Sequence, residues 1–147
     1  MKRLAAPLLL AIWLLAGCVI APKEVILYNA SDAVIISHLK RDRSYVDFDR
    51  IAVWAVGDRK IGPTYVGGMT QLAPGNQALL IHYYTKPGIG PEFEAYVPLS
   101  ASLPVGARLR LNGKTDGSDA VVWLEDATSG AVVGGTGRGP MRIAPRY

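Results

Sequence analysis

Cysteine is almost absent from this chain of 147 residues, which contains only Cys18. Because no cysteine follows it, the rest of the chain cannot form an intramolecular disulfide and must be stabilised by packing. Histidine is nearly as rare, and the two histidines, His38 and His82, show no H-x-H or H-x-x-x-H spacing. A metal site needs three or four converging ligands, so we interpret both as hydrogen-bonded structural residues and predict no metal site.

A helical pattern is also missing beyond residue 23. No window of twelve residues carries apolar residues at i, i+3, i+4 and i+7 without a glycine or proline. Short apolar runs alternate instead with polar residues, and turn signals separate them. This pattern predicts an all-β protein with a single antiparallel β-sandwich over residues 24–133. The expected strands are 33–39, 50–56, 64–72, 77–84, 92–103, 107–113, 120–126 and 131–135, with Pro98 marking an edge or bulged strand.

Residues 1–17 have the three parts of an export signal. Lys2 and Arg3 supply a basic start, residues 4–15 form an apolar run, and two small residues follow. The run has twelve residues, whereas a membrane-spanning helix needs roughly 20. We therefore expect a signal peptide that is removed rather than a helix that spans the membrane.

The residues Leu15, Ala16, Gly17 and Cys18 resemble the lipobox of bacterial lipoproteins. In that family the cysteine receives a diacylglyceryl thioether, and the signal is cut just before it. The resemblance implies lipidation at Cys18, with this covalent lipid as the only bound group and no cofactor. The alternatives are a secreted protein with an unpaired cysteine and an uncleaved anchor helix.

Residues 18–23 form a short tether in this interpretation. In many lipoproteins an aspartate after the lipidated cysteine retains the protein at the inner membrane, and here the residue is Val19. The resemblance therefore implies a lipid anchor at the periplasmic face of the outer membrane, with the membrane as one partner.

The net charge of +4 includes Lys2 and Arg3, which belong to the signal. Their removal leaves 14 basic against 12 acidic residues, so the mature chain is close to neutral. A nearly neutral, exported protein is not expected to bind nucleic acid.

Two stretches resemble a known group of domains. Leu72-Ala73-Pro74-Gly75-Asn76, which leads into strand 77–84, resembles the small proteobacterial lipoproteins of unknown function and, more distantly, PEGA-type domains. The stretch 121–133 is similar to the closing hairpin of the same lipoproteins. The resemblance covers residues 50–133 and implies an Ig-like β-sandwich in the periplasm, without implying an activity.

The stretch "DRSYVDFDR", residues 42–50, interleaves aspartates with arginines. It lacks the glycine that a calcium-binding loop needs, and the arginines neutralise the acidic cluster. We expect a solvated loop with paired charges. No serine stands in a G-x-S-x-G turn, which makes a hydrolase the least favoured function.

Exposed aromatic rings are candidates for binding sugars or protein partners. We expect Trp54 and Trp123 to belong to the core, whereas Tyr84 and Tyr96 are possible binding residues. Residues 134–147, rich in glycine and proline, are expected to form a flexible or loosely docked tail. Within it Arg138, Arg142 and Arg146 are candidates for contacts with anionic lipid head groups or cell-wall phosphates, or belong to a solvated terminus.

No candidate catalytic constellation has suitable spacing, so the sequence predicts a protein that is not an enzyme. A tethered β-sandwich that presents its edges and loops fits a cell-envelope interaction or assembly module with protein or cell-wall partners. The alternative is a lipoprotein that binds glycans or small molecules through exposed tyrosines.

Overall fold

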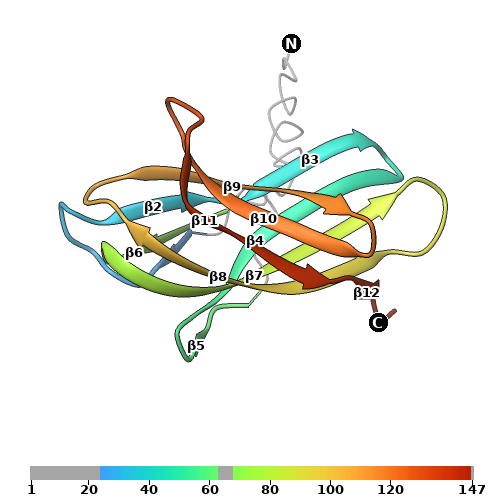
Figure 1. The fold of residues 1–147 in the computed structure, drawn as a ribbon, viewed down its shortest axis with the longest axis horizontal. Helices are drawn as coiled ribbons and strands as arrows, with labels where there is room; N and C mark the ends of the chain where they lie inside the picture. Colours follow the sequence, from blue (N-terminus) through green and yellow to red (C-terminus); the bar gives the residue numbers. More distant parts are fainter. Residues whose placement is uncertain (1–23, 63–67, 147) are drawn as a thin grey trace, which may run out of the picture.

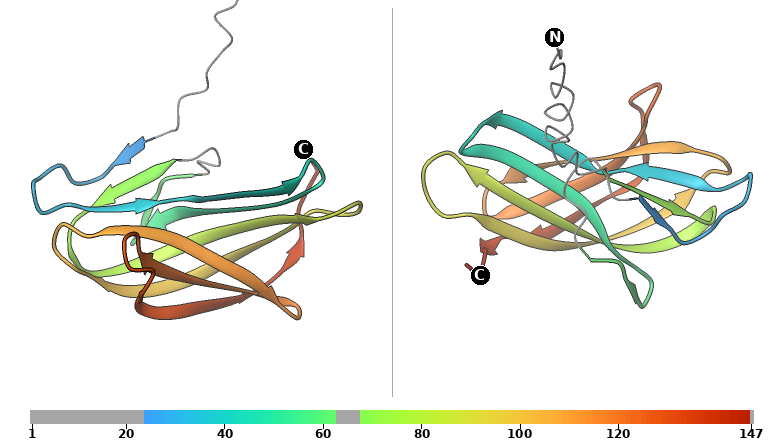
Figure 2. Two further views of the ribbon diagram at one scale, coloured as in Figure 1. Left: turned by 90° about the horizontal axis from the view of Figure 1, so that it is seen from above. Right: turned by 180° about the vertical axis from the view of Figure 1, so that it is seen from behind.

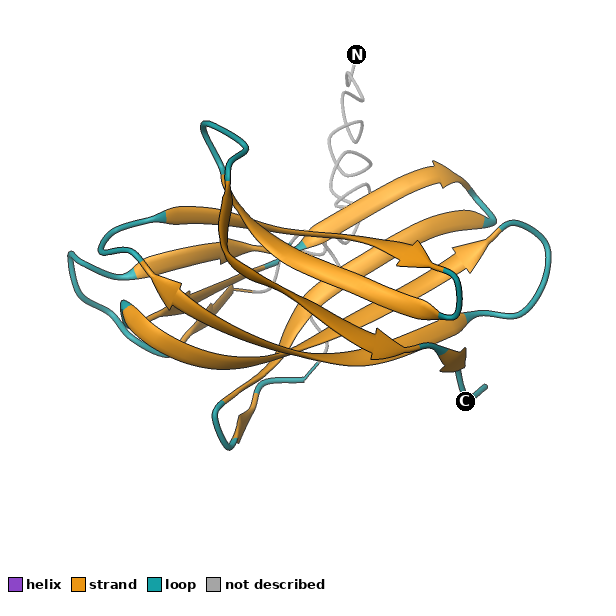
Figure 3. Cartoon of the chain, in the orientation of Figure 1, coloured by secondary structure: helices purple, strands orange, loops and turns teal. Residues whose placement is uncertain are grey.

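The computed structural model describes residues 24–62 and 68–146, and within these ranges the chain forms strands and loops without a helix (Figure 3). No helix in this part is long and apolar enough to cross a membrane. The strands are β1 (Glu24–Ile26), β2 (Val34–Ser37), β3 (Leu39–Ser44), β4 (Asp47–Val56), β5 (Arg59–Lys60), β6 (Met69–Leu72), β7 (Gly75–Pro87), β8 (Phe93–Leu103), β9 (Arg108–Asp116), β10 (Asp119–Asp126), β11 (Val132–Pro140) and β12 (Arg142–Ile143).

The strands form two sheets that face each other (Figures 1 and 2). Sheet A has the order β1-β6-β2-β9-β10-β11, and sheet B has the order β12-β8-β7-β4-β3, with β5 paired to β4. The prediction of an all-β protein with two packed sheets is therefore confirmed. Sheet B is antiparallel throughout, as expected.

Sheet A corrects the prediction of a purely antiparallel sandwich. β1 pairs with β6 in parallel, and β2 pairs with β9 in parallel. The second pair arises because the loops that lead into β2 and β9 lie together at one end of the sheet. The amide of Gly106 donates to the carbonyl of Asp32, and the amide of Ile35 donates to the carbonyl of Ala107. Two strands that enter a sheet from the same end must run in the same direction.

The core lies between the inner faces of the two sheets. In sheet B, Val53, Ile81 and Val97 stand opposite one another on three neighbouring strands, and all three are fully buried. Leu111 and Leu124 are paired across β9 and β10 and close the core from sheet A. Trp54 and Trp123, expected in the core, are instead half-buried and lie outside this cluster.

For residues 134–146 the structure corrects the expectation of a flexible or loosely docked tail. β11 pairs with β10 except at Gly134 and Gly135, where the register shifts, and β12 pairs with β8, so the sandwich extends beyond residue 133. The glycines of β11 have a packing role, because a Cβ on Gly137 would lie 2.5 Å from the carbonyl oxygen of Pro98. Only glycine permits such a close approach of two backbones. Pro98 itself lies beyond the short β12 pairing, at the edge expected for it.

Several connections meet at one end of the sandwich, on the right in Figure 1. They are the β3–β4 turn, the β7–β8 loop, the β9–β10 hairpin and the link between β11 and β12. β1, where the described chain begins, lies toward the other end (Figure 2, left). We call the end with these four connections the cleft end, because a cleft opens there.

Candidate functional site

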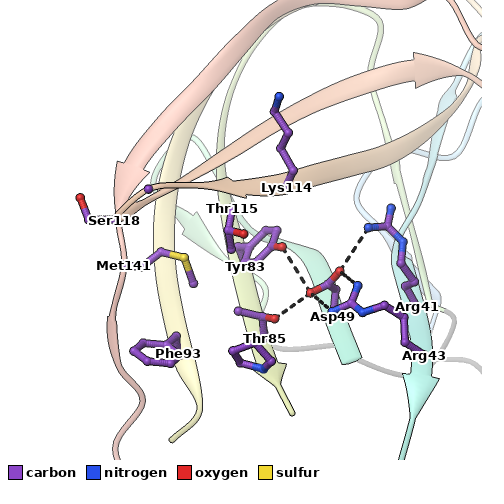
Figure 4. A pocket seen from close by; sticks show the side chains of 12 residues that line it. Arg41, Arg43, Asp49, Tyr83, Thr85, Phe93, Lys114, Thr115, Ser118 and Met141 are labelled. Atoms are coloured by element: carbon purple, nitrogen blue, oxygen red, sulfur yellow. Dashed lines mark hydrogen bonds and ion pairs between the residues drawn. The ribbon is translucent and has the colours of Figure 1, made fainter. Parts of the chain in front are cut away.

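A cleft of about 490 Å³ opens at the cleft end, between sheet B and the β9–β10 hairpin of sheet A (Figure 4). Its volume lies within the range of roughly 300–1,000 Å³ that is typical of small-ligand pockets. The lining residues come from both sheets and from the β11–β12 link: Arg41, Arg43, Asp49, Tyr83, Thr85, Pro87, Phe93, Lys114, Thr115, Gly117, Ser118 and Met141.

Asp49 is the central residue of this cleft. It alternates with Ile51 and Val53 along β4, so its side chain points inward, and only 3% of its surface is exposed. Burying a carboxylate costs folding free energy unless hydrogen-bond donors or cations surround it. The hydroxyl of Thr85 donates to it at 2.7 Å, and the hydroxyl of Tyr83 donates at 3.3 Å.

Two arginines of the edge strand β3 complete the shell around Asp49. Arg43 donates from Nη1 to Asp49 Oδ2 at 2.6 Å, and Arg41 donates from Nη1 to the same oxygen at 3.2 Å. Arg43 also donates to Asp47 at 2.8 Å, and Arg41 reaches across to Asn112 of sheet A at 3.0 Å. The stretch expected to be a solvated loop is thus a β-hairpin with one buried aspartate, although its charges are paired as predicted.

Electrostatics fix the protonation states around Asp49. Burial acts to raise the pKa of Asp49, but the hydrogen bonds from Arg43 and Thr85 and the charge of Arg41 outweigh it and hold the pKa below the ordinary 3.8. Burial, aided by the Asp49 charge, raises the pKa of the Tyr83 phenol. At neutral pH Asp49 is therefore ionised and Tyr83 is protonated, so the carboxylate anchors the arginines and is a weak base.

The walls of the cleft differ in character. Arg41 and Arg43 lie on one side in Figure 4, whereas Phe93 and Met141 lie on the other. Lys114 lies at the rim on β9 and forms no ion pair with any described residue. The cleft therefore joins a cationic side to an apolar side. Such an arrangement suits an anionic group attached to an apolar one.

Tyr84 and Tyr96, the aromatic candidates from the sequence, lie elsewhere, on the outer face of sheet B. The Tyr96 ring stacks on His82 with centroids 4.6 Å apart and meets the edge of Trp54 at 5.1 Å. The guanidinium of Arg142 lies 5.5 Å from the same ring centroid. The Tyr84 hydroxyl donates to Glu92, and burial together with this bond raises the pKa of Tyr84 to about 12.

Both histidines are buried and hydrogen-bonded, as the structural interpretation predicts. His38 Nε2 lies 2.9 Å from Thr70 Oγ1, and His82 Nε2 lies 2.9 Å from Glu94 Oε2. Burial lowers the pKa of His82 more than Glu94 raises it, so His82 is neutral at pH 7 and its Nε2–H donates to the carboxylate. Within the described ranges no three His, Cys, Asp or Glu side chains are grouped as metal ligands.

The structure separates the three arginines of the C-terminal segment. Arg138 binds Asp116 and Asp119, and Arg142 donates twice to Glu94, at 2.8 and 3.0 Å. Arg146 lines a second hollow of about 500 Å³ beside Tyr84, Lys86 and Glu92. Two of the three arginines are thus engaged by carboxylates of the sandwich.

Sequence reasoning missed Asp49, Arg41 and Lys114 as members of one site. A signal for Asp49 was present, since it lies two and four residues before Ile51 and Val53 and so shares their inward face. The lipobox residues lie outside the described part of the chain: Leu15, Ala16, Gly17 and Cys18.

Fold and site together define an all-β protein of two packed sheets with a charged cleft at one end. No family model, curated protein or solved structure matches this chain.

Proposed function

We propose that this protein is a lipid-anchored module of the bacterial cell envelope that acts by binding a partner and not by catalysis. In this proposal Cys18 carries the lipid, residues 1–17 are the signal peptide, and the sandwich, of Ig-like type, faces the periplasm from the outer membrane. The partner is an envelope protein or a cell-wall component, and the cleft end is the surface that meets it.

The observation that carries the proposal is the cleft with its organised arginines. Asp49 is surrounded by donors, so it is not available as a base or nucleophile, and its role is to hold Arg41 and Arg43 in place. Positioned guanidinium groups recognise carboxylates and phosphates. This chemistry supports recognition of a ligand without turnover.

Exposed apolar side chains at the same end support a macromolecular partner. Tyr45, in the β3–β4 turn, is 99% exposed, and Ile89, in the β7–β8 loop, is 97% exposed. Loops at the end of a rigid sandwich are common places for binding residues, and both side chains are carried by such loops. β1 lies toward the opposite end, so a tether at the N-terminus leaves this end accessible.

Crosslinking in living cells tests this function. The full chain is crosslinked, attached partners are identified, and the experiment is repeated with Lys114→Glu and with Arg41→Ala. Arg108→Glu is the matched control, because Arg108 is exposed at the far end of the same strand β9. The proposal predicts reproducible partners that the two cleft variants lose and the control keeps. Partners that all variants retain equally would contradict it.

A glycan-binding lipoprotein is the second candidate. It is supported by the hollow that Tyr84 shares with Lys86, Glu92 and Arg146, because charged side chains beside an aromatic ring suit sugar hydroxyls. This alternative predicts saccharide binding that Tyr84→Ala or Tyr96→Ala abolishes and Lys114→Glu leaves intact. Binding assays with cell-wall sugars therefore separate the two candidates.

A further inference from the structure

Cations predominate among the charged residues that line the cleft. Arg41, Arg43 and Lys114 are cations, and Asp49 is the one carboxylate among these lining residues. Asp116 and Glu125, whose pKa values Lys114 and Arg41 help to lower, lie outside the lining. The lining itself therefore favours an anionic ligand, and a carboxylate is such a group.

Arg41 has hydrogen-bond donors to offer that ligand. It gives one hydrogen of Nη1 to Asp49 and one of Nη2 to Asn112, which leaves Nε and one hydrogen on each terminal nitrogen without a partner among the described residues. Its side chain is 39% exposed, so these donors are accessible. Charge-assisted bonds between a guanidinium and a carboxylate are among the strongest hydrogen bonds in proteins.

The apolar side of the cleft provides a place for the group attached to that carboxylate. Phe93 of β8 and Met141 of the β11–β12 link lie there, opposite the arginines (Figure 4). Pro87, at the end of β7, adds to the same lining. An apolar side chain beside a carboxylate would thus bury its surface against these three residues.

The flanks of the cleft indicate a chain rather than a free small molecule. Tyr45 lies two residues after Arg43, and Ile89 lies two residues after Pro87, so both exposed side chains project from the loops that border the cleft. A small acid held in the cleft leaves these side chains in water. A polypeptide that enters the cleft has to pass the bordering loops and gives them a partner.

We infer that the cleft binds the C-terminal residue of a partner polypeptide, with its carboxylate at Arg41 and an apolar side chain against Phe93 and Met141, while Lys114 adds positive charge at the rim. The residues that precede the C-terminus contact Tyr45 and Ile89. This inference rests on the proposed function, because it names the part of the partner that the cleft receives.

Fluorescence anisotropy of N-terminally labelled peptides tests the inference on the detergent-solubilised full chain. The probes are short peptides that end in phenylalanine, leucine or valine, each with a free C-terminus and as the C-terminal amide. We expect at least one free acid to bind and its amide to bind at least about tenfold more weakly, since the amide loses a charge-assisted interaction. Equal binding of acid and amide would overturn the inference.

Three variants show where the ligand binds and whether it is a peptide or a free small acid. Lys114→Glu should weaken binding of the free-acid peptide about fivefold or more, and Arg108→Glu should change its affinity less than twofold. Tyr45→Ser combined with Ile89→Ser should weaken binding of the peptides. The affinity for 3-phenylpropionate, a small acid of the same chemistry, should stay unchanged. If 3-phenylpropionate binds as tightly as the peptides, the ligand is a free acid and the inference is wrong.

Failure of the inference can be distinguished from failure of the proposed function. If no probe binds but crosslinks in cells still depend on Arg41 and Lys114, the cleft meets its partner through other chemistry, and only the C-terminal assignment is overturned. If the crosslinks are also independent of these residues, both the inference and the proposed function are wrong.

Discussion

Arg43 of the edge strand β3 donates to the buried carboxylate of Asp49 on β4 at 2.6 Å, and this ion pair ties the edge of sheet B to its interior. The pair also determines the character of the cleft, because Asp49 holds both Arg43 and Arg41 at the opening. One carboxylate therefore serves the stability of the sandwich end and the geometry of the candidate site.

Replacement of Asp49 by asparagine should lower the free energy of unfolding by about 2 kcal/mol. The variant keeps the size of the side chain but removes the charge that two guanidinium groups and two hydroxyls surround. Urea denaturation measures the change. Asp58→Asn is the matched control, since Asp58 is exposed in the turn before β5, and its effect should stay below about 0.5 kcal/mol. A similar loss in both variants would contradict the role of Asp49.

The close approach of β11 to β8 predicts a contrast between two glycines on one strand. A Cβ on Gly137 would lie 2.5 Å from the carbonyl oxygen of Pro98 and 2.9 Å from Val97 Cγ1, so Gly137→Ala should destabilise the fold by about 2 kcal/mol. A Cβ on Gly135 meets no atom within 4 Å, so Gly135→Ala should be neutral or slightly stabilising. Thermal unfolding of the two variants compares them directly. A harmless Gly137→Ala would show that the two strands do not pack as described.

Stability should depend on pH through His82. Burial holds the pKa of His82 in the folded state below the ordinary value of 6.5, at which the histidine of the unfolded chain titrates. Below that pH the unfolded state binds the proton first, so the free energy of unfolding falls as the pH decreases from 6.5 toward the folded pKa. The carboxylate of Asp49 acts only in a lower window, because its pKa is held below 3.8.

His82→Gln removes this titrating group and should flatten the stability profile in that window. Urea denaturation from about pH 7.5 down to about pH 5 measures the slope in the wild type and in the variant. An unchanged slope in the variant, or a wild type that becomes more stable as the pH falls, would contradict the assignment.

Lipidation at Cys18 predicts a defined mass and a defined location. The protein extracted from membranes should have lost residues 1–17 and should carry acyl chains on a new N-terminal cysteine. Cys18→Ser should abolish both the added mass and the membrane association. Without acyl chains the protein has no hydrocarbon to bury in the bilayer, and this burial is what anchors it. Intact mass spectrometry and fractionation decide the matter. A membrane-bound Cys18→Ser protein would show that another segment provides the anchor.

Alternation of apolar and polar residues predicted most of the strands, because inward residues such as Ile81 and Val97 follow the period of a pleated sheet. It failed for β3, where residues 40–43 are all charged, and it found only the first part of β11, where glycines replace apolar side chains. In β11 the glycines reflect close packing against β8, a tertiary requirement that the local sequence does not reveal.

The candidate site was less accessible to prediction than the fold. The pairing of charges in residues 42–50 was predicted, but the burial of Asp49 was not, because the strand that carries it was assumed to begin at Arg50. The contribution of Lys114 and Met141 depends on how sheet A closes over sheet B. Such contacts join segments that are far apart in the chain, and alternation within one segment does not specify them.

Site-specific photocrosslinking in cells tests most directly whether the cleft end is the binding surface. A photoreactive residue replaces Thr115, which lines the cleft, and in a second strain it replaces Ser102, which is exposed on β8 toward the opposite end. After irradiation, mass spectrometry identifies what is attached to each protein. The account predicts a defined adduct at position 115 and none at position 102. An adduct at position 102 with none at position 115 would contradict it.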